Sequence, residues 1–296
     1  MISLQGIFPP LPTAFDSQQA LFTDKMQENI RYLSRYDLAG FLVLGSNGEL
    51  VNLTYKEKCH VYEQCREAIP GDKLMLAGTG HQSTYETIQA CRDAARAGAD
   101  AVVVLNPSYY KGLMNRKALT EHYLAVADAS QVPVIIYNMP ANSGLDMDAD
   151  TIADISTHEN VIGLKDSGGN MVKMGTIIDR VRPDFQVLAG SAGFLLPALS
   201  LGASGGILAL ANIAPDACLD IYGHFLNGNL ERARQGQLNA IPLNTAVTRQ
   251  WGVPALKEAM DHLGLYGGPP RSPLLTVSTE VRSALHRLIS ERDIHL

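Results

Sequence analysis

The sequence lacks an apolar run long enough to cross a bilayer. Its longest apolar stretches, such as residues 205–211, have the length of a strand, whereas a spanning helix needs about 18 or more apolar residues. Near the N-terminus no basic stretch precedes an apolar one, and no arginine-rich stretch occurs. We therefore expect a cytoplasmic protein with no signal peptide, no transit segment and no membrane partner.

Blocks of like charge, paired cysteines and metal-binding spacings are also missing. The net charge is −6, and without a basic cluster we expect no nucleic-acid partner. The four cysteines show no CxxC spacing and the eight histidines no HExxH spacing, which predicts neither a disulfide framework nor a metal site.

No glycine-rich phosphate-binding turn follows the first apolar run. Residues 9–13 read Pro-Pro-Leu-Pro-Thr, whereas a doubly wound dinucleotide-binding sheet needs GxGxxG at that point. What the sequence does have is 46% hydrophobic and 18% charged residues, a composition that supports a large core and excludes global disorder.

Short apolar runs alternate with amphipathic stretches along the first three quarters of the chain. Strands alternating with helices indicate βαβ units, and eight such units predict a closed barrel. The expected strands are residues 6–11, 40–44, 74–77, 101–105, 134–137, 161–165, 186–189 and 205–208. The expected helices are residues 24–36, 55–69, 84–97, 116–129, 148–155, 172–181, 192–201 and 217–226.

The alternation stops at about residue 227. Three further helices are expected at residues 229–243, 254–263 and 279–289, joined by turns rich in glycine and proline. The sequence therefore predicts a TIM (β/α)8 barrel over residues 1–226 and a C-terminal helical extension, residues 227–296, packed on it.

In such a barrel the reacting side chains lie at the carboxyl ends of the strands. Lys165 follows four apolar residues at the end of the sixth predicted strand. Desolvation of a lysine favours the free amine, which attacks ketones to form a Schiff base. The alternative is a strand-end lysine paired with Asp166 or another carboxylate, and the spacing alone does not decide between the two.

Two neighbouring strands end in polar groups that suit the same chemistry. Tyr137 ends the fifth strand, where a phenol can carry protons for a nearby amine; a core tyrosine with a bonded hydroxyl is the commoner alternative. Ser46 and Asn47 follow the second strand between two glycines and can bind a carboxylate, although an ordinary Asn-Gly turn is favoured on the residues alone.

The other strand ends add hydroxyls and small residues. Tyr109 and Tyr110 follow the fourth strand, Gly168-Gly169 and Gly190 follow the sixth and seventh, and Gly205-Gly206 belong to the eighth. Small residues leave an open cavity with accessible amides. This set of one amine with phenols, hydroxyls and amides favours carbonyl chemistry through an imine. We expect no cofactor, because the covalent imine with Lys165 serves that purpose.

Several of these segments, in this order, resemble the dihydrodipicolinate synthase / N-acetylneuraminate lyase family of class I aldolases. The resemblance extends from Gly6 to about Leu275 and implies a TIM barrel, pyruvate as one partner, no metal and a homotetramer built as a dimer of dimers. The segments that carry it are residues 45–49 (GSNGE), 109–110 (YY), 137–140 (YNMP) and 163–166 (GLKD).

The resemblance also assigns roles to single residues. It implies that Lys165 forms the Schiff base and that Tyr137 relays protons. Tyr109 matches a tyrosine that reaches into the neighbouring subunit's site; a match shifted by one residue within the tyrosine pair is the alternative. Ser46 and Asn47 stand where the synthases usually carry two threonines, and they would bind the pyruvoyl carboxylate.

The resemblance narrows the substrate. Asn142 stands where dihydrodipicolinate synthases carry an arginine, so the cation that binds the distal carboxylate of their aldehyde substrate is missing. The pattern resembles more closely aldolases that cleave 4-hydroxy-2-oxoglutarate to pyruvate and glyoxylate, with Ser167 and Gly190 contacting the distal half of that 2-oxo acid.

Three alternatives remain at this point. The first is an aldolase acting on 2-keto-3-deoxy sugar acids. The second is a true synthase condensing pyruvate with aspartate semialdehyde. The third is a ketoacid-binding regulator that has lost turnover.

Overall fold

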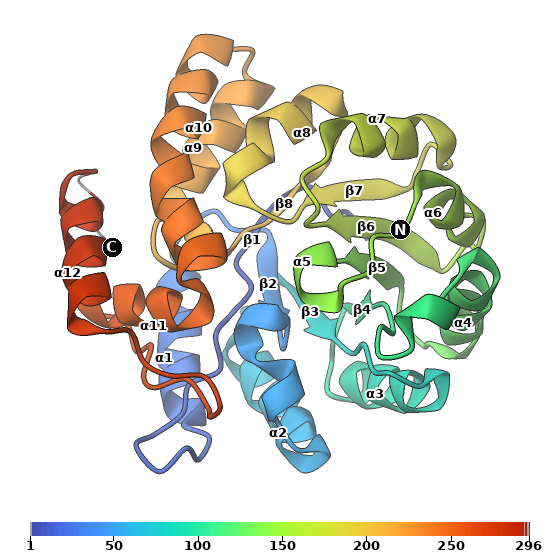
Figure 1. Ribbon diagram of the computed structural model, residues 1–296, viewed down its shortest axis with the longest axis horizontal. Coiled ribbons are helices and arrows are strands. Elements are labelled where there is room, and N and C mark those ends of the chain that lie inside the picture. The colour runs from blue at the N-terminus through green and yellow to red at the C-terminus, as the bar shows by residue number, and fades with distance from the viewer. Residues whose placement is uncertain (1, 293, 295) are drawn as a thin grey trace.

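The computed structural model describes residues 2–292, 294 and 296 and contains one parallel eight-stranded sheet in the order β1-β8-β7-β6-β5-β4-β3-β2. Between the two end strands, the Leu42 amide donates to the Pro9 carbonyl at 3.0 Å and the Leu11 amide to the Leu42 carbonyl at 2.9 Å. The predicted barrel is thereby confirmed (Figure 1). Its strands are β1 Gly6–Phe8, β2 Gly40–Val43, β3 Leu74–Gly78, β4 Ala101–Leu105, β5 Val134–Asn138, β6 Val161–Asp166, β7 Gln186–Ala189 and β8 Gly205–Ile207.

The first strand is shorter than predicted. It ends at Phe8 because Pro9 and Pro10 have no N–H to donate to a neighbouring strand. Pro10 still forms an isolated parallel bridge with Leu42, so the contact that closes the barrel uses the Pro9 carbonyl and the Leu11 amide on either side of it.

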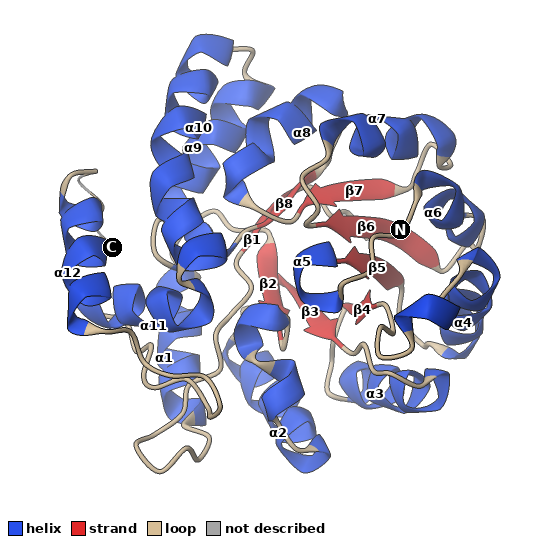
Figure 2. Ribbon diagram, viewed as in Figure 1, coloured by secondary structure: helices blue, strands red, loops and turns tan. Residues whose placement is uncertain are grey.

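The eight predicted barrel helices are all present, and they surround the sheet (Figure 2). The short helix α5, Pro140–Ser143, was not predicted and lies in front of the barrel mouth. The predicted helix 192–201 is split into a 3-10 turn, Ala192–Phe194, and α8. The barrel helices are α1 Thr23–Leu33, α2 Tyr55–Ala68, α3 Thr84–Arg96, α4 Arg116–Ala129, α6 Ala149–Ser156, α7 Met171–Arg180, α8 Leu195–Leu201 and α9 Pro215–Leu226.

The core has an inner and an outer layer. The inner cluster fills the barrel and includes Leu76, Ile135 and Tyr137, whereas the outer cluster, with Ile136 and Leu164, lies between sheet and helices. Because successive side chains of a strand point to opposite faces, this division shows which residues face the barrel interior.

The three helices predicted in the C-terminal extension are also present: α10 Leu230–Thr245, α11 Gly252–His262 and α12 Thr279–Ser290. Helix α10 lies along α9 (Figure 1). It runs directly into a π-helix, Ala246–Gln250, before α11 begins. A π-helix is rare and often marks a functional site.

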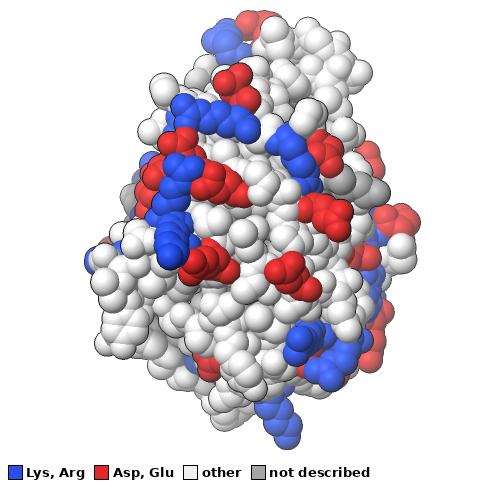
Figure 3. All heavy atoms as spheres, turned by 90° about the vertical axis from the view of Figure 1, so that its right-hand side faces the viewer, with Lys and Arg blue, Asp and Glu red and all other residues white. Residues whose placement is uncertain are grey.

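The surface mixes both signs of charge. The face drawn in Figure 3 carries basic and acidic side chains next to one another. Ion pairs join α4 to α6 and α7 to α6, for example Arg116 to Asp154 at 2.6 Å and Arg180 to Asp150. Among the described residues, no helix is both long and apolar enough to cross a membrane.

A buried ion pair ties the extension to the barrel mouth. Lys257 of α11 lies 2.7 Å from Glu49, which follows β2, and both side chains are 1% exposed. The Lys257 amine also donates to the Pro269 carbonyl at 2.9 Å and lies 4.7 Å from the ring centroid of Phe15. Burial lowers the pKa of Lys257, and the Glu49 carboxylate opposes that shift.

We expect Lys257→Met to lower the free energy of unfolding by about 3–5 kcal/mol, because it leaves the Glu49 carboxylate buried without its counter-ion. Urea denaturation measures the loss. The double variant Glu49→Gln/Lys257→Met should recover part of it, because it removes the stranded charge.

The matched control is Arg234→Met, which breaks the exposed ion pair between Arg234 and Glu231 on α10. Such exposed pairs contribute little, so the unfolding midpoint should hardly move. If Lys257→Met costs no more than this control, the buried pair does not stabilise the fold.

Candidate active site

A cavity of about 590 Å³ opens at the carboxyl ends of the strands. Six of the seven predicted site residues line it: Ser46, Asn47, Tyr137, Lys165, Ser167 and Gly190. These residues are distant in the sequence and come from the ends of β2, β5, β6 and β7. The parallel barrel brings them together, because all eight strands end at the same mouth.

Lys165 and Tyr137 are direct neighbours across the sheet. The register pairs Tyr137 of β5 with Lys165 of β6, and both side chains face the barrel interior. Lys165 is 3% exposed, and its Nζ lies 4.1 Å from the centroid of the Tyr137 ring. The ring face therefore covers part of the amine while the rest faces the cavity.

No carboxylate in residues 2–292 lies within ion-pair distance of the Lys165 amine. The nearest acid in the sequence, Asp166, points to the other face of the sheet, where its Oδ1 accepts from Asn138 at 2.6 Å and lies 3.6 Å from the Lys173 amine. The alternative of a Lys165–Asp166 pair is thus excluded. The amine remains free to act as a nucleophile.

A polar cluster behind the site joins the two strand ends. The side-chain amide of Asn138 donates to Asp146 at 2.8 Å as well as to Asp166, and its side-chain oxygen Oδ1 accepts from the Met147 amide at 3.1 Å. Lys173 completes the cluster through Asp146 and Asp166. The sequence analysis missed it; the signal was a polar residue directly after each of the two inward-facing site residues.

Ser46 bonds to the phenol of Tyr137. Its Oγ lies 3.1 Å from the Tyr137 hydroxyl oxygen, so a proton can pass between them. The turn that carries Ser46 has left-handed backbone at both of its ends, at Leu44 (φ 55°) and at Glu49 (φ 53°). A hydrogen bond of 2.6 Å from the Thr13 hydroxyl to the Gly48 carbonyl holds it in place. The turn is thus a fixed part of the site.

Gly190 allows the strand ends to approach each other closely. A Cβ at this position would lie 2.0 Å from Ser167 Oγ, and the Gly190 amide donates to the Asp166 carbonyl at 2.8 Å. Ser167 Oγ is itself buried and has no hydrogen-bond partner among the described residues. Ser167 lines the cavity, but its Oγ is turned toward the Gly190 backbone and is shielded from solvent.

Tyr109, the seventh predicted residue, lies outside the cavity of its own chain. Its side chain is 79% exposed, and its ring packs edge-on against Tyr110 with centroids 5.0 Å apart. The Tyr109 amide is held by Gln82 at 2.8 Å. Gln82 lines a second cavity of about 230 Å³, which Tyr137 and Ser46 also line.

The extension contributes side chains that the sequence analysis did not place in the site. Val247, Thr248 and Arg249 of the π-helix, together with Val253 of α11, line the cavity. An ordinary α-helical period does not present three consecutive residues to one cavity. The available signal was the interruption of the helical pattern between Pro242 and Gly252.

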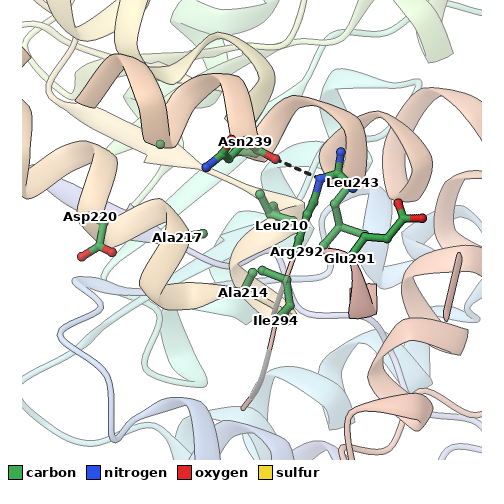
Figure 4. A pocket seen from close by; sticks show the side chains of 11 residues that line it. Leu210, Ala214, Ala217, Asp220, Asn239, Leu243, Glu291, Arg292 and Ile294 are labelled. Carbon is green, nitrogen blue, oxygen red and sulfur yellow. Dashed lines mark hydrogen bonds between the residues drawn. The ribbon is translucent and has the colours of Figure 1, made fainter. Parts of the chain in front are cut away.

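A separate cavity of about 580 Å³ lies beside α9, α10 and the end of the chain (Figure 4). Arg292 crosses it and donates to the Asn239 carbonyl at 3.2 Å. None of the seven predicted site residues lines it, so the chemistry suggested by the sequence belongs to the barrel mouth.

The mouth combines a buried lysine amine without a described carboxylate partner, a phenol ring that covers it and a hydroxyl bonded to that phenol. An amine in this setting can add to a ketone, and the phenol can supply and remove the protons that imine formation needs.

Comparison with known proteins agrees with this chemistry. A model of the dihydrodipicolinate synthetase family matches residues 3–292. The chain is 38% identical over 291 residues to a protein of Emericella nidulans named a probable mitochondrial 4-hydroxy-2-oxoglutarate aldolase, covering 97% of this chain and 94% of the relative. It is 32% identical over 288 residues to a 4-hydroxy-tetrahydrodipicolinate synthase of Methanothrix thermoacetophila, covering 97% and 96%.

The fold has similar solved structures. One is a prophage protein of E. coli K12 that belongs to the dihydrodipicolinic acid synthase family and was solved in complex with pyruvate. Its TM-score to this chain is 0.93 at 27% sequence identity, and the match covers 98% of this chain and 99% of that one. The chain therefore belongs to the dihydrodipicolinate synthetase family and is a lyase of the class I aldolase kind.

Proposed function

We propose that the protein cleaves 4-hydroxy-2-oxoglutarate to pyruvate and glyoxylate through an imine on Lys165. The observation that carries the proposal is the arrangement of three groups: the buried Lys165 amine, the Tyr137 ring 4.1 Å away, and the Ser46 hydroxyl 3.1 Å from that phenol. The 38% identity to a probable 4-hydroxy-2-oxoglutarate aldolase supports the choice of substrate.

Imine formation is the first half of the reaction. The Lys165 amine adds to the C2 ketone of the substrate, and the carbinolamine then loses water to give a protonated imine. Tyr137 donates the proton that leaves with this water, and Ser46 is placed to pass protons to and from the phenol.

Carbon–carbon cleavage is the second half. The phenolate of Tyr137 takes the proton of the C4 hydroxyl, the C3–C4 bond breaks, and its electrons flow into the protonated imine to form an enamine. Glyoxylate leaves. The enamine is protonated at C3, and hydrolysis releases pyruvate and the free amine of Lys165.

The remaining predicted residues bind the two ends of the substrate. Ser46, Asn47 and nearby backbone amides bind the C1 carboxylate through hydrogen bonds. Ser167, with its unpartnered hydroxyl, and Gly190 contact the distal half.

The second candidate is condensation of pyruvate with aspartate semialdehyde, which the synthase relative favours. Asn142 lines the cavity and carries no charge, so that position offers no cation to an incoming carboxylate. A sugar-acid aldolase uses the same imine and a longer substrate. Rates of pyruvate release from 4-hydroxy-2-oxoglutarate and from 2-keto-3-deoxygluconate, and the rate of condensation, distinguish the three.

Removing the amine should abolish the reaction. For Lys165→Ala we expect pyruvate release from 4-hydroxy-2-oxoglutarate to fall by about 10³-fold or more, and borohydride should no longer attach pyruvate to the chain. Mass spectrometry of the reduced protein measures the attachment. Lys117→Ala, at an exposed lysine of α4, is the control and should retain both properties. Substantial cleavage by Lys165→Ala would refute the imine mechanism.

Removing the phenol hydroxyl should slow proton transfer without unfolding the protein. We expect Tyr137→Phe to lower kcat by about 10²–10⁴-fold, with a smaller loss for Ser46→Ala. The matched control is Tyr123→Phe, because Tyr123 is a buried tyrosine like Tyr137. Its hydroxyl lies outside the cavity and donates to the Val104 backbone carbonyl at 2.9 Å. A control that loses as much activity as Tyr137→Phe would mean that the effect is structural.

We further propose that Tyr109 completes the site of a neighbouring subunit in a homotetramer built as a dimer of dimers. The exposure of its ring and its place beside the second cavity support this role. An incoming tyrosine would extend the hydrogen-bonded pair of Ser46 and Tyr137.

Subunit mixing tests this role. Lys165→Ala and Tyr109→Ala should each be nearly inactive, but a hybrid dimer of the two has one site with both an intact lysine and an intact neighbouring tyrosine. Activity should therefore return when the two variants are unfolded and refolded together. Tyr110→Ala is the control for the alternative pairing. Full activity in a proven monomer, or no recovery in hybrids, would reject the proposal.

A further inference from the structure

Arg249 lies at the mouth of the active-site cavity, on the π-helix of the extension. It forms no ion pair or side-chain hydrogen bond with any other residue that the structure describes. Its guanidinium lies against the loop after β6: a Cβ built on Gly169, whose φ is +73°, would be 3.5 Å from Arg249 Nη2. The same loop follows Lys165 and carries Ser167.

The charge of the cavity lining is one-sided. Among the described residues that line it, Lys165 and Arg249 are the basic side chains, and no aspartate or glutamate lies there. An enclosed site with one sign of charge concentrates ligands of the opposite sign. Two basic side chains without a carboxylate fit a ligand with more than one negative group.

Ser167 offers a hydroxyl that a rotation of its side chain would bring into this part of the cavity. Its Oγ is buried and has no partner in the described chain, although buried polar groups are nearly always hydrogen-bonded. The hydroxyl is on the loop that Arg249 overlies. A carboxylate placed beside Arg249 would accept from the planar guanidinium, which binds carboxylates in a bidentate manner. Rotation about the Ser167 Cα–Cβ bond would bring the Ser167 hydroxyl to the same carboxylate.

We infer that Arg249 is a specificity-determining residue, which binds the distal carboxylate of a five-carbon 2-oxo diacid while Lys165 holds the C2 carbon. The inference rests on the proposed imine at Lys165 and deepens the proposed function, because it selects a diacid over a sugar acid whose distal end is neutral. The extension thus supplies the cation that Asn142 does not.

The test uses ketoacids that form an imine but have no C4 hydroxyl and are not cleaved. 2-Oxoglutarate has the distal carboxylate, and 2-oxopentanoate has a methyl group in its place. Borohydride traps each ketoacid on the intact protein, and mass spectrometry measures the trapped fraction. The quantity compared is the ketoacid concentration that gives half-maximal trapping. For Arg249→Gln we expect this concentration to rise about 10–100-fold with 2-oxoglutarate, the range of a charge-assisted hydrogen bond, and to stay unchanged with 2-oxopentanoate.

Two controls separate the guanidinium from its surroundings. Arg232→Gln removes an exposed arginine of α10 that does not line the active-site cavity. It should leave the half-maximal trapping concentrations of both ketoacids unchanged. Because charge attraction is screened by ions, the wild-type preference for the diacid should also shrink as salt is raised. A rise that is equal for both ketoacids, or no rise for either, would overturn the inference.

The readout distinguishes the two proposals from each other. If the wild-type protein traps 2-oxoglutarate but releases no pyruvate from 4-hydroxy-2-oxoglutarate, the proposed cleavage is wrong, while the loss on Arg249→Gln still tests the arginine. If cleavage is fast but Arg249→Gln leaves kcat/KM for 4-hydroxy-2-oxoglutarate unchanged, the function stands and the arginine is not its specificity residue.

Discussion

The site depends on burying the Lys165 amine without giving it a carboxylate. Taking a lysine amine out of water is costly unless a partner offsets the lost hydration. In this site the face of the Tyr137 ring lies next to the amine. The pleat of β6 makes this possible. Because consecutive side chains point to opposite faces, Asp166 is next to Lys165 in sequence but lies on the other side of the sheet, where Lys173 and Asn138 bind it.

The acid on the outer face holds the strands that carry the nucleophile and the phenol in register. Asn138 and Asp166 pair across β5 and β6 one residue beyond the level at which Tyr137 and Lys165 pair on the inner face. One pair of strand ends therefore presents reacting groups inward and structural groups outward. A shift of one residue in either strand would exchange the two sets, so the register of β5 and β6 fixes the chemistry as well as the fold.

The barrel was predictable from the sequence because it follows from short-range patterns, whereas the proposed roles of the six cavity-lining residues came largely from the family resemblance. Apolar runs such as residues 101–105 and a lysine at a strand end are visible along the chain. Arg249 and the Glu49–Lys257 pair were not predictable in this way. Each depends on how α10 and α11 pack over the mouth, a long-range contact that no local period encodes. Tyr109 remains a prediction, since its proposed partner site is on another subunit.

The proposed roles, imine chemistry in the barrel and distal binding in the extension, account for a family whose members are named for different substrates. The lysine and the phenol lie on strand ends, and the hydroxyl partner lies on a turn with left-handed backbone at Leu44 and Glu49. The π-helix between α10 and α11 reaches the same cavity from outside the barrel. A substitution there alters the charge that meets the distal half of a substrate without moving Lys165 or Tyr137. Specificity can therefore change in the extension while the imine chemistry of the barrel stays the same.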